Sequence, residues 1–315
     1  MEKISLIIPC YNEEESLPTL YAELKRVTAE MSEYAFEMLF VDDGSKDKTL
    51  SLLKEMAKED ERVKYISFSR NFGKESAMYA GFCNATGDYV AALDADMQDP
   101  PALLPQMMQI IKTQGYDSVA TRRVMRKGEP RIRSAFARTF YKIMHRISDV
   151  DIVDGARDFR LMKREMVDAL VAMCEHDRFS KGIFGWIGFK TYWLPFENVK
   201  RVAGKTKWSF FKLFKYSIDG ILAFSDAPLK VPGVCSVISF IAAMGMLIWA
   251  LVRRFGQNLP FFDWQFVTAV ALGCTGLVLA CMAIVCAYLG KIKKEVKNRP
   301  QYLVRDTNKE NIVLK

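Results

Sequence analysis

The chain has 315 residues, of which half are apolar and 26% are charged. This composition can bury a sizeable core, which excludes a disordered tail and a disulfide-stapled miniprotein. The 45 Lys and Arg outnumber the 37 Asp and Glu, and the net charge of +8 favours an anionic partner: phosphates, nucleic acid or a membrane surface. The seven cysteines lack metal-type spacing, so we expect reduced packing residues.

The first 230 residues alternate short apolar runs with longer amphipathic stretches, which is typical of an α/β fold with a mostly parallel sheet covered by helices. In chain order we predict a strand over 4–8, a helix over 14–31, a strand over 36–41, a helix over 48–58, a strand over 63–68, a helix over 75–85, a strand over 89–93, a helix over 101–113 and a strand over 118–121. Acidic and polar residues cluster where these strands end. Because open α/β sheets bind ligands outside the carboxyl ends of their strands, we expect the site there.

Two later segments, 231–252 and 264–290, carry no charge, and each is long enough to cross about 30 Å of hydrocarbon as a helix. A polar connector separates them, so we predict a helical hairpin. Basic residues flank the pair and place both flanks in the cytosol, although Arg253 and Arg254 argue the other way. Buried core helices of a soluble protein are the alternative. We divide the chain into 1–200, a membrane-proximal segment 201–230, the hairpin within 231–290 and a basic tail 291–315.

The strongest chemical signal is an Asp-x-Asp directly after the strand over 89–93. Side chains two residues apart on an extended chain point the same way, so Asp94 and Asp96 can converge on a hard divalent cation such as Mg²⁺ or Mn²⁺. The Gln98 carbonyl oxygen supplies a further ligand, and diphosphate oxygens and water would complete the shell. A polar strand end followed by an Asp-Pro turn is the alternative for such a pair alone.

Polar residues also follow the first two strands. Asp42 could accept hydrogen bonds from a base or a ribose, and Tyr11 could flank a base. Asp47 is a plausible cap for the helix over 48–58. This cluster needs no function as local structure.

The runs IIPCYNEEESL, VDDGSKDKT, SRNFGKESAMYAGF and ALDADMQDPP, in this order and followed by an apolar hairpin, resemble the family-2 glycosyltransferases of GT-A fold. Within that family they resemble the polyprenyl-phosphate branch. The resemblance implies that Pro9, Tyr11, Glu13, Asp42 and Asp94 bind a nucleotide sugar. It also implies that Asp94, Asp96 and Gln98 hold the metal against the diphosphate.

Three polar residues after the third strand, Arg70, Asn71 and Lys74, are expected to reach the nucleotide or to brace the site. A solvated loop is the alternative for Lys74.

The segment 122–146 holds nine Lys or Arg and one acidic residue, with aromatic residues at helical spacing. It predicts a basic amphipathic helix for anionic headgroups, with Arg122 and Arg126 on the acceptor phosphate. Nucleic acid is the competing partner, but no nucleic-acid module accompanies the charge.

The acceptor side is expected around Asp158 and Arg160, whose sequence context resembles that of the family. Asp158 could act as a base or orient the attacking group, and Arg160 could pair with it or with phosphate; a structural ion pair between the two is the alternative. A lipid phosphate is largely dianionic at neutral pH, so a base is not strictly required. A loop resembling the family's mobile loop would add phosphate donors. These are Arg201, Lys205, Lys207 and Ser209.

The resemblance implies an inverting enzyme of the cell membrane that moves one hexose from a nucleotide sugar to polyprenyl (undecaprenyl) phosphate at the cytosolic leaflet. UDP-glucose is the first candidate donor. The same reaction with UDP-GlcNAc, UDP-galactose or GDP-mannose stays open, as does a non-catalytic, membrane-anchored nucleotide-sugar sensor. The uncharged hairpin argues against a transporter. Partners are then the nucleotide sugar, the lipid and the bilayer, and the family allows a homo-oligomer such as a tetramer.

Overall fold

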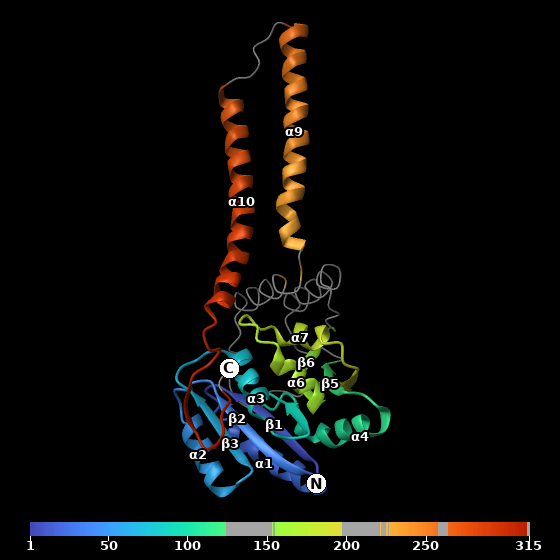
Figure 1. Cartoon of the computed structure of the whole chain (residues 1–315), viewed down its shortest axis with the longest axis vertical. Coiled ribbons are helices and arrows are strands. Elements are labelled where there is room, and N and C mark those ends of the chain that lie inside the picture. The colour runs from blue at the N-terminus through green and yellow to red at the C-terminus, as the bar shows by residue number, and fades with distance from the viewer. Residues whose placement is uncertain are drawn as a thin grey trace. The chain divides into compact units, whose positions relative to one another are not determined.

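The computed structural model of the chain describes residues 1–123, 153, 155–196, 221, 225, 227–257 and 264–313 (Figure 1). The chain forms two compact units. One comprises Met1–Gly220 together with Arg299–Lys315, and the other comprises Ile221–Asn298.

The first unit alternates strands and helices along the chain. Its elements are β1 (Lys3–Cys10), α1 (Leu17–Glu30), β2 (Ala35–Asp42), α2 (Thr49–Glu59), β3 (Val63–Phe68), α3 (Lys74–Asn84), β4 (Tyr89–Ala92), the 3-10 turn η1 (Pro101–Leu103), α4 (Leu104–Gln114), β5 (Ser118–Arg123), β6 (Ala156–Lys163), α6 (Arg164–Ala172), α7 (Ser180–Trp186), β7 (Thr191–Phe196) and β8 (Val304–Thr307). Every strand and helix predicted over residues 4–121 is present, with ends that differ by a few residues. The predicted α/β class is therefore confirmed.

The described strands form one eight-stranded sheet in the order β7-β5-β6-β4-β1-β2-β3-β8. The central strands β4, β1, β2 and β3 run parallel, with Leu6 of β1 paired to Met38 of β2 and to Ala91 of β4. β6 runs antiparallel to both β4 and β5, and β8 runs antiparallel to β3. The carboxyl ends of the four central strands therefore meet at one edge of the sheet.

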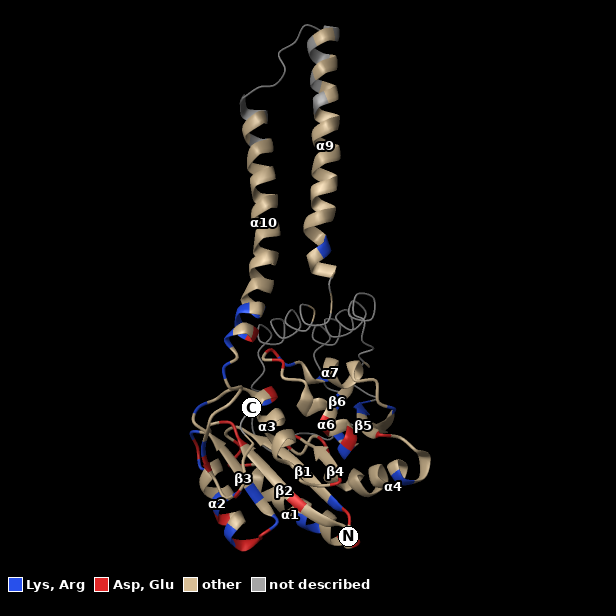
Figure 2. Ribbon diagram, viewed as in Figure 1, with Lys and Arg blue, Asp and Glu red and all other residues tan. Residues whose placement is uncertain are grey.

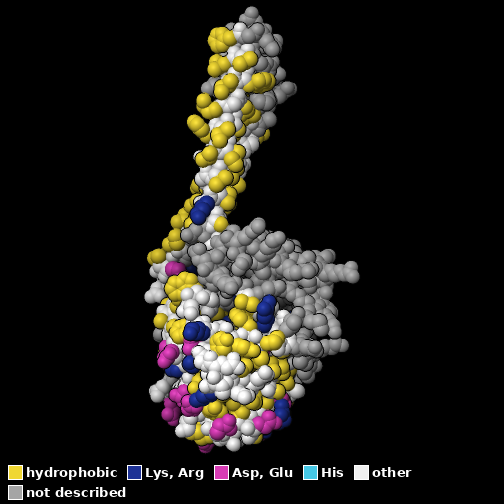
Figure 3. Space-filling view, turned by 90° about the vertical axis from the view of Figure 1, so that its right-hand side faces the viewer, with side chains coloured by type: hydrophobic (Ala, Val, Ile, Leu, Met, Phe, Trp, Pro, Cys, Tyr) yellow, Lys and Arg dark blue, Asp and Glu magenta, His cyan; other side chains and the backbone are white. Residues whose placement is uncertain are grey.

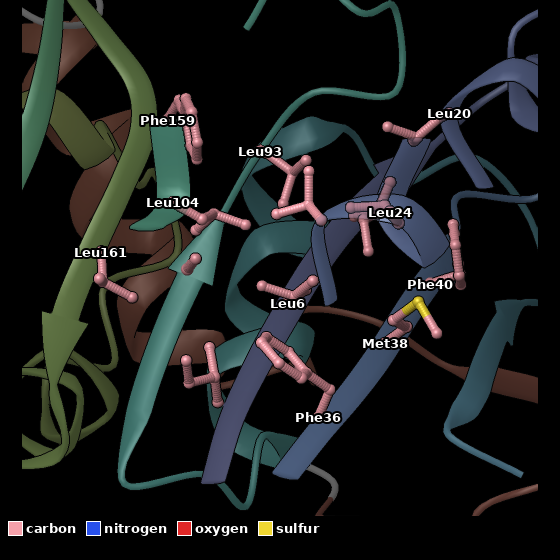
Figure 4. Close-up of a cluster of buried hydrophobic side chains, with 14 of the residues drawn as sticks. Leu6, Leu20, Leu24, Phe36, Met38, Phe40, Leu93, Leu104, Phe159 and Leu161 are labelled. Carbon is pink, nitrogen blue, oxygen red and sulfur yellow. The ribbon is translucent and has the colours of Figure 1, made fainter. Parts of the chain in front are cut away.

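The core lies on both faces of the sheet because the central strands are buried on both sides, as their nearly continuous apolar sequence predicts. On one face, Leu6, Met38 and Phe40 pack against Leu20 and Leu24 of α1 (Figure 4). α2 and α4 pack on this same face. On the opposite face, α3 covers the alternate residues of β2 and β3. These layers hold the strand ends rigidly in place.

The last strand comes from the C-terminal segment, for which the sequence suggested only a basic tail. β8 pairs with β3 at the sheet edge. Beside it, the ring of Tyr302 stacks on that of Phe68 with centroids 5.0 Å apart, and the Tyr302 hydroxyl donates to the Val313 carbonyl over 2.6 Å. The Asn84 side-chain oxygen accepts from the Val313 N–H over 2.8 Å. Residues 299–313 are thus part of the sheet domain.

The second unit contains two long helices, α9 (Ala227–Gln257) and α10 (Trp264–Lys297), which pack against each other. They contain the two segments that the sequence predicted as a helical hairpin. Within the described residues these two helices are long and apolar enough to cross a membrane, with mean hydropathy 1.7 over Ala227–Met246 and 2.4 over Val270–Lys297. Most of their length carries no charge (Figure 2). Their apolar side chains stand exposed, Phe240 by 68% (Figure 3).

Candidate functional site

The candidate site lies at the carboxyl ends of β1, β2, β3 and β4. From β1 the chain winds outward through β2 and β3 and then returns to form β4 on the other side of β1. The loops that follow β1 and β4 therefore lie next to each other at the point where the strand order reverses. Such a switch point is where open α/β sheets bind ligands.

The loops after β1 and β2 are joined by hydrogen bonds between backbone and side chains. The Asn12 N–H donates to the Ser45 hydroxyl over 2.9 Å, and the Asn12 side-chain oxygen accepts from the Lys46 N–H over 2.8 Å. The Glu13 N–H donates to the Thr49 hydroxyl over 2.8 Å. Asn12 has φ of 51°, a left-handed conformation that Asn tolerates better than most residues. The predicted residues Tyr11 and Glu13 lie on this loop, half-buried, next to Pro9 at the end of β1.

Asp42 ends β2 and is only 1% exposed. Its Oδ1 accepts from the Ser45 N–H over 3.0 Å and its Oδ2 accepts from the Ser67 hydroxyl over 2.7 Å. The carboxylate is therefore fixed between β2 and β3. Each oxygen can accept a second hydrogen bond, so the predicted nucleoside contact is compatible with this arrangement.

The neighbouring Asp43 holds the loop after β3, a role that the sequence analysis missed. Its carboxylate accepts from the Phe72 N–H over 2.6 Å and from the Gly73 N–H over 2.9 Å. Burial raises the pKa of Asp43 to about 6, and these two hydrogen bonds oppose the rise. Gly44 has φ of 67°, and a Cβ there would lie 2.5 Å from the Arg70 carbonyl carbon. The two loops can approach this closely only because residue 44 is glycine.

The Asp-x-Asp pair follows β4 in a tight turn. Asp94 is half-buried, whereas Asp96 is buried and its Oδ1 accepts from the Gln98 N–H over 3.1 Å. Met97, which follows the pair, has φ of 60°. Met97 thus reverses the chain direction in a left-handed conformation, and the Gln98 N–H of the same loop orients the Asp96 carboxylate.

Lys74, the first residue of α3, lies between two carboxylates, one in the turn after β4 and one in β6. Its Nζ is 2.6 Å from Asp94 Oδ1 and 2.5 Å from Asp158 Oδ2. The register of β4 and β6 pairs Ala92 with Arg160, so two residues further on Asp94 comes opposite Asp158. A cation between two such carboxylates cancels their repulsion. Lys74 therefore lies in an ion-paired group at the start of α3 rather than in a solvated loop, and its role in bracing a catalytic site stays a prediction.

The ion pairs in this group shift the pKa values of Lys74 and Asp158. Burial acts to raise the pKa of Asp158, but Lys74 and Lys181 outweigh it and hold that pKa well below its usual range. Burial acts to lower the pKa of Lys74, and Asp158 and Asp94 reverse this and raise it. At neutral pH Lys74 is therefore a cation and Asp158 an anion.

A second ion pair supports the same turn. The Arg157 guanidinium donates to both Asp99 oxygens, with Nε 2.8 Å from Oδ1 and Nη2 3.2 Å from Oδ2. Asp99 is fully buried. Such a bidentate pair fixes the loop after β4 to the start of β6, and with it the spacing of Asp94 and Asp158. The sequence alone indicates only an Asp-Pro turn at Asp99.

Arg160 is 3% exposed and does not form the ion pair that was suggested with Asp158. The described salt-bridge partner of Asp158 is Lys74. The Arg160 guanidinium instead lies 4.2 Å from the Phe184 ring centre and 5.4 Å from that of Trp193. Its Nη1 donates to the hydroxyls of Ser118 and Thr191, over 3.4 and 3.3 Å. Arg160 therefore remains a candidate for binding an anion.

The remaining predicted residues are only partly within the described chain. Arg122 lies exposed near the end of β5. Arg126, Arg201, Lys205, Lys207 and Ser209 lie outside the described residues, as does most of the expected basic helix. The cap of α2 is Lys48 rather than Asp47, although Asp47 Oδ1 accepts from the Thr49 N–H over 3.0 Å.

The donor set at the end of β4 fits a hard divalent cation. Asp94 and Asp96 present carboxylate oxygens within one turn, which Mg²⁺ and Mn²⁺ prefer. Across the described residues, however, no group of three or more His, Cys, Asp or Glu side chains is placed to hold a metal ion. A metal at this turn would therefore need oxygens from elsewhere, and a diphosphate has them.

Comparison with known proteins identifies the family to which the chain belongs. The family model for glycosyl transferase family 2 matches residues 5–171. The bactoprenol glucosyl transferase of Shigella phage SfII is 36% identical over 98% of this chain and 99% of its own. The uncharacterized glycosyltransferase sll0501 of Synechocystis sp. is 37% identical over 96% of this chain and 95% of its own. Among solved structures, mannosyl-3-phosphoglycerate synthase from Rubrobacter xylanophilus aligns over 70% of this chain and 72% of its own, with a TM-score of 0.47 and 16% identity.

The sheet domain carries acidic loops at its switch point, and the glycosyl transferase family 2 model matches more than half of the chain. Together these findings define the protein as a glycosyltransferase. The chain belongs to glycosyl transferase family 2. The family predicted from the four short motifs is confirmed, as is the mostly parallel α/β sheet followed by two long apolar helices.

Proposed function

We propose that the protein transfers one hexose from a nucleotide sugar to a polyprenyl phosphate, and UDP-glucose is the first candidate donor. The observation that carries the proposal is the Asp94–Lys74–Asp158 group at the carboxyl edge of the sheet, beside the buried cation Arg160. It provides anionic oxygens for a metal–diphosphate on one side and positive charge for a phosphate on the other. The full-length similarity to a bactoprenol glucosyl transferase supports the lipid acceptor.

The nucleoside is expected at the loops after β1 and β2, with Pro9, Tyr11, Glu13 and Asp42 as its contacts. Hydrogen bonds between these loops fix their positions before any ligand binds. Binding then costs little loop ordering. Asp94 follows β4, the strand next to β1, which suits a diphosphate that extends from the nucleoside toward β4.

A divalent metal held by Asp94, Asp96 and Gln98 would neutralise the charge that develops on the departing diphosphate. An oxygen of the lipid phosphate attacks the anomeric carbon and forms the new C–O bond. The bond from that carbon to the diphosphate breaks, and its electron pair leaves with the nucleoside diphosphate. In-line attack inverts the configuration and gives a β-linked product from an α-linked donor.

Asp158 suits a positioning role in this reaction better than that of a base. Its carboxylate is held by Lys74, and its pKa lies well below its usual range because Lys74 and Lys181 outweigh burial. The dianionic acceptor needs no proton removed. The charge of Asp158 and its fixed position would orient the attacking group instead.

The two apolar helices support a membrane location. We infer that α9 and α10 span the bilayer as a hairpin, with the sheet domain and both termini on the cytosolic side, where the donor is. The exposed apolar side chains along both helices support this placement, as do the basic residues at the end of α10, Lys291, Lys293, Lys294 and Lys297. Contact with further copies of the chain would cover part of these surfaces.

The donor is identified by offering the purified full chain, in detergent, a panel of radiolabelled UDP- and GDP-sugars with undecaprenyl phosphate. We expect a labelled, organic-soluble product from one donor, formed only with Mg²⁺ or Mn²⁺. A protein that binds a nucleotide sugar but transfers none of these sugars would instead be a sensor, and the proposal would be wrong.

A further inference from the structure

A pocket of about 200 Å³ lies between α7 and the face of the sheet formed by β5, β6 and β7. Its lining combines cations with aromatic rings: Arg157, Arg160, Lys181, Phe184, Phe189 and Trp193. One water molecule takes up about 30 Å³ in the liquid, so the pocket has room for a phosphate group and a short stretch of chain.

Arg160 gives the pocket a buried cation whose donors are incompletely satisfied. Within the described residues its guanidinium bonds only the hydroxyls of Ser118 and Thr191, and its buried Nε has no hydrogen-bond partner. No described carboxylate forms a salt bridge with it. Asp158 acts on Arg160 electrostatically but forms no salt bridge with it. A buried charge whose donors are only partly paired is unfavourable, so this group favours an anionic ligand.

The charge of Arg160 persists under ordinary conditions. Burial lowers the pKa of Arg160 to about 9, which still leaves the guanidinium protonated at neutral pH. The nearby rings of Phe184 and Trp193 contribute cation–π stabilisation but accept no hydrogen bond in the plane of the guanidinium.

A second cation lies at the same pocket. Arg157 already pairs with Asp99, whereas Lys181, in the first turn of α7, is half-buried and lines the pocket. Lys181 also acts electrostatically on Asp158, which places the pocket next to the proposed reaction centre. Two cations that form no salt bridge among the described residues thus flank one cavity.

Apart from Thr191 and Gly185, the rest of the lining is apolar, which favours a ligand with an apolar part over a hydrated ion. Phe184, Phe189 and Trp193 contribute rings, and Val153 and Ala156 add aliphatic surface. A ligand that uses the whole pocket is therefore anionic at one end and hydrocarbon at the other.

We propose that this pocket binds a phosphate monoester together with the first apolar unit of the chain that carries it. Arg160 and Lys181 hold the phosphate, and Phe189 contacts the hydrocarbon. The inference rests on the proposed function, which it deepens by assigning the acceptor end to particular residues. It adds Lys181, Phe189 and Trp193 to a site for which the sequence suggested only Arg160 in this part of the chain.

The test is calorimetric titration of the purified full chain in detergent, without nucleotide, using geranyl phosphate, geraniol and inorganic phosphate. Geraniol enters micelles as geranyl phosphate does but lacks the charge, and inorganic phosphate lacks the chain. We expect geranyl phosphate to bind more tightly than inorganic phosphate, and geraniol to give only the heat of micelle partition.

The variants separate the two ends of the ligand. Lys181→Gln should weaken binding of both phosphates about tenfold, the loss expected for one charge-assisted contact. Phe189→Ala should weaken geranyl phosphate about fivefold and leave inorganic phosphate unchanged. Lys190→Gln, an exposed lysine outside the pocket lining, is the matched control and should bind as the parent chain does.

Unchanged affinity for geranyl phosphate in both Lys181→Gln and Arg160→Lys, with unfolding temperatures near that of the parent, would overturn the assignment. Equal binding of the two phosphates, with no effect of Phe189→Ala, would identify a free-phosphate site and overturn the lipid part. The proposed function is tested separately. Predicted binding without any sugar transfer would refute that function alone, while transfer with an unchanged acceptor KM in Lys181→Gln would refute the pocket alone.

Discussion

At the scale of residues, the site depends on charges brought together from distant parts of the chain. Lys74 and Asp158 are 84 positions apart, and the antiparallel pairing of β4 with β6 brings Asp94, just after β4, opposite Asp158 of β6. The motif around each residue can be recognised in the sequence. The Asp-x-Asp and its position at the end of a strand were predicted in this way. The ion pairs could not, because no local pattern says which carboxylate a lysine will meet.

Asp96→Asn should lower kcat about 10²- to 10³-fold, because it replaces a proposed metal ligand by a neutral group of the same size. The Asp96 carboxylate already has a backbone partner in the Gln98 N–H, which the amide oxygen of the variant side chain can keep, so the fold should survive. Steady-state transfer assays and thermal unfolding of both proteins check this. Near-normal turnover in a folded variant would remove Asp96 from the metal site.

Lys74→Met should lower kcat by about 10-fold or more, because Asp94 and Asp158 lose the cation between them. The same change should tighten Mn²⁺ binding, since Asp94 no longer shares its charge with Lys74. Mn²⁺ binding is measured directly by electron paramagnetic resonance, independently of activity. Lys58→Met, at an exposed lysine of α2, is the control. Weaker Mn²⁺ binding in Lys74→Met would contradict this account.

At the scale of elements, the predicted strands and helices of residues 4–121 were found because their apolar runs and amphipathic stretches are long and regular. β8 was missed because Val304–Thr307 is short and largely polar. It is defined instead by partners far away in the chain, such as the Thr307 hydroxyl bonded to the Tyr65 carbonyl over 2.7 Å. Tertiary contacts decide such a strand, and a single sequence does not display them.

Glu37 joins β2 to the C-terminal segment. Its side chain is 5% exposed, and its Oε1 accepts from Lys309 Nζ over 2.8 Å. Burial acts to raise the pKa of Glu37, but hydrogen bonds from Lys309, Ser5 and Thr86 outweigh it and lower the pKa from 4.5 to about 2. Because the pKa of the folded state is depressed, the stabilisation is fully present above pH 4.5 and is lost as the pH falls toward 2. It amounts to about 3 kcal/mol at most.

Lys309→Met should therefore lower the unfolding temperature of the full chain at pH 7, and the difference from the parent should shrink by pH 3.5. Scanning calorimetry at the two pH values measures both differences. Lys309→Arg keeps the charge and should retain most of the stability. An equal loss for Lys309→Met at the two pH values would show that the ion pair with Glu37 is not the cause.

At the scale of the whole molecule, the sheet domain is discontinuous in sequence. Residues 221–298 separate the last strand from the rest of its domain. Tyr302, 1% exposed and stacked on Phe68, shows that the returning segment belongs to the core rather than to a loose tail. Any C-terminal truncation that removes the two helices therefore also removes β8 from the sheet.

Replacing residues 227–297 by a flexible Gly/Ser linker of about 20 residues, which spans roughly 25 Å on average, should give a folded protein that still binds nucleotide sugar. Truncation after residue 226 should be less stable, because it exposes the β3 edge and the Phe68 ring. Thermal unfolding and nucleotide binding of the two proteins test this. Equal stability of both would show that β8 does not support the domain.

The central claim is tested most directly by one assay, in which UDP-[14C]glucose and undecaprenyl phosphate are incubated with the full chain, with its Asp158→Asn variant, or with the full chain and EDTA. We predict a labelled, β-linked glucosyl lipid from the parent chain with Mg²⁺ or Mn²⁺, at least about 100-fold less from the variant, and none with EDTA. Equal product from the parent and the variant, or product that persists in EDTA, would contradict the account of the site built on Asp94, Lys74 and Asp158.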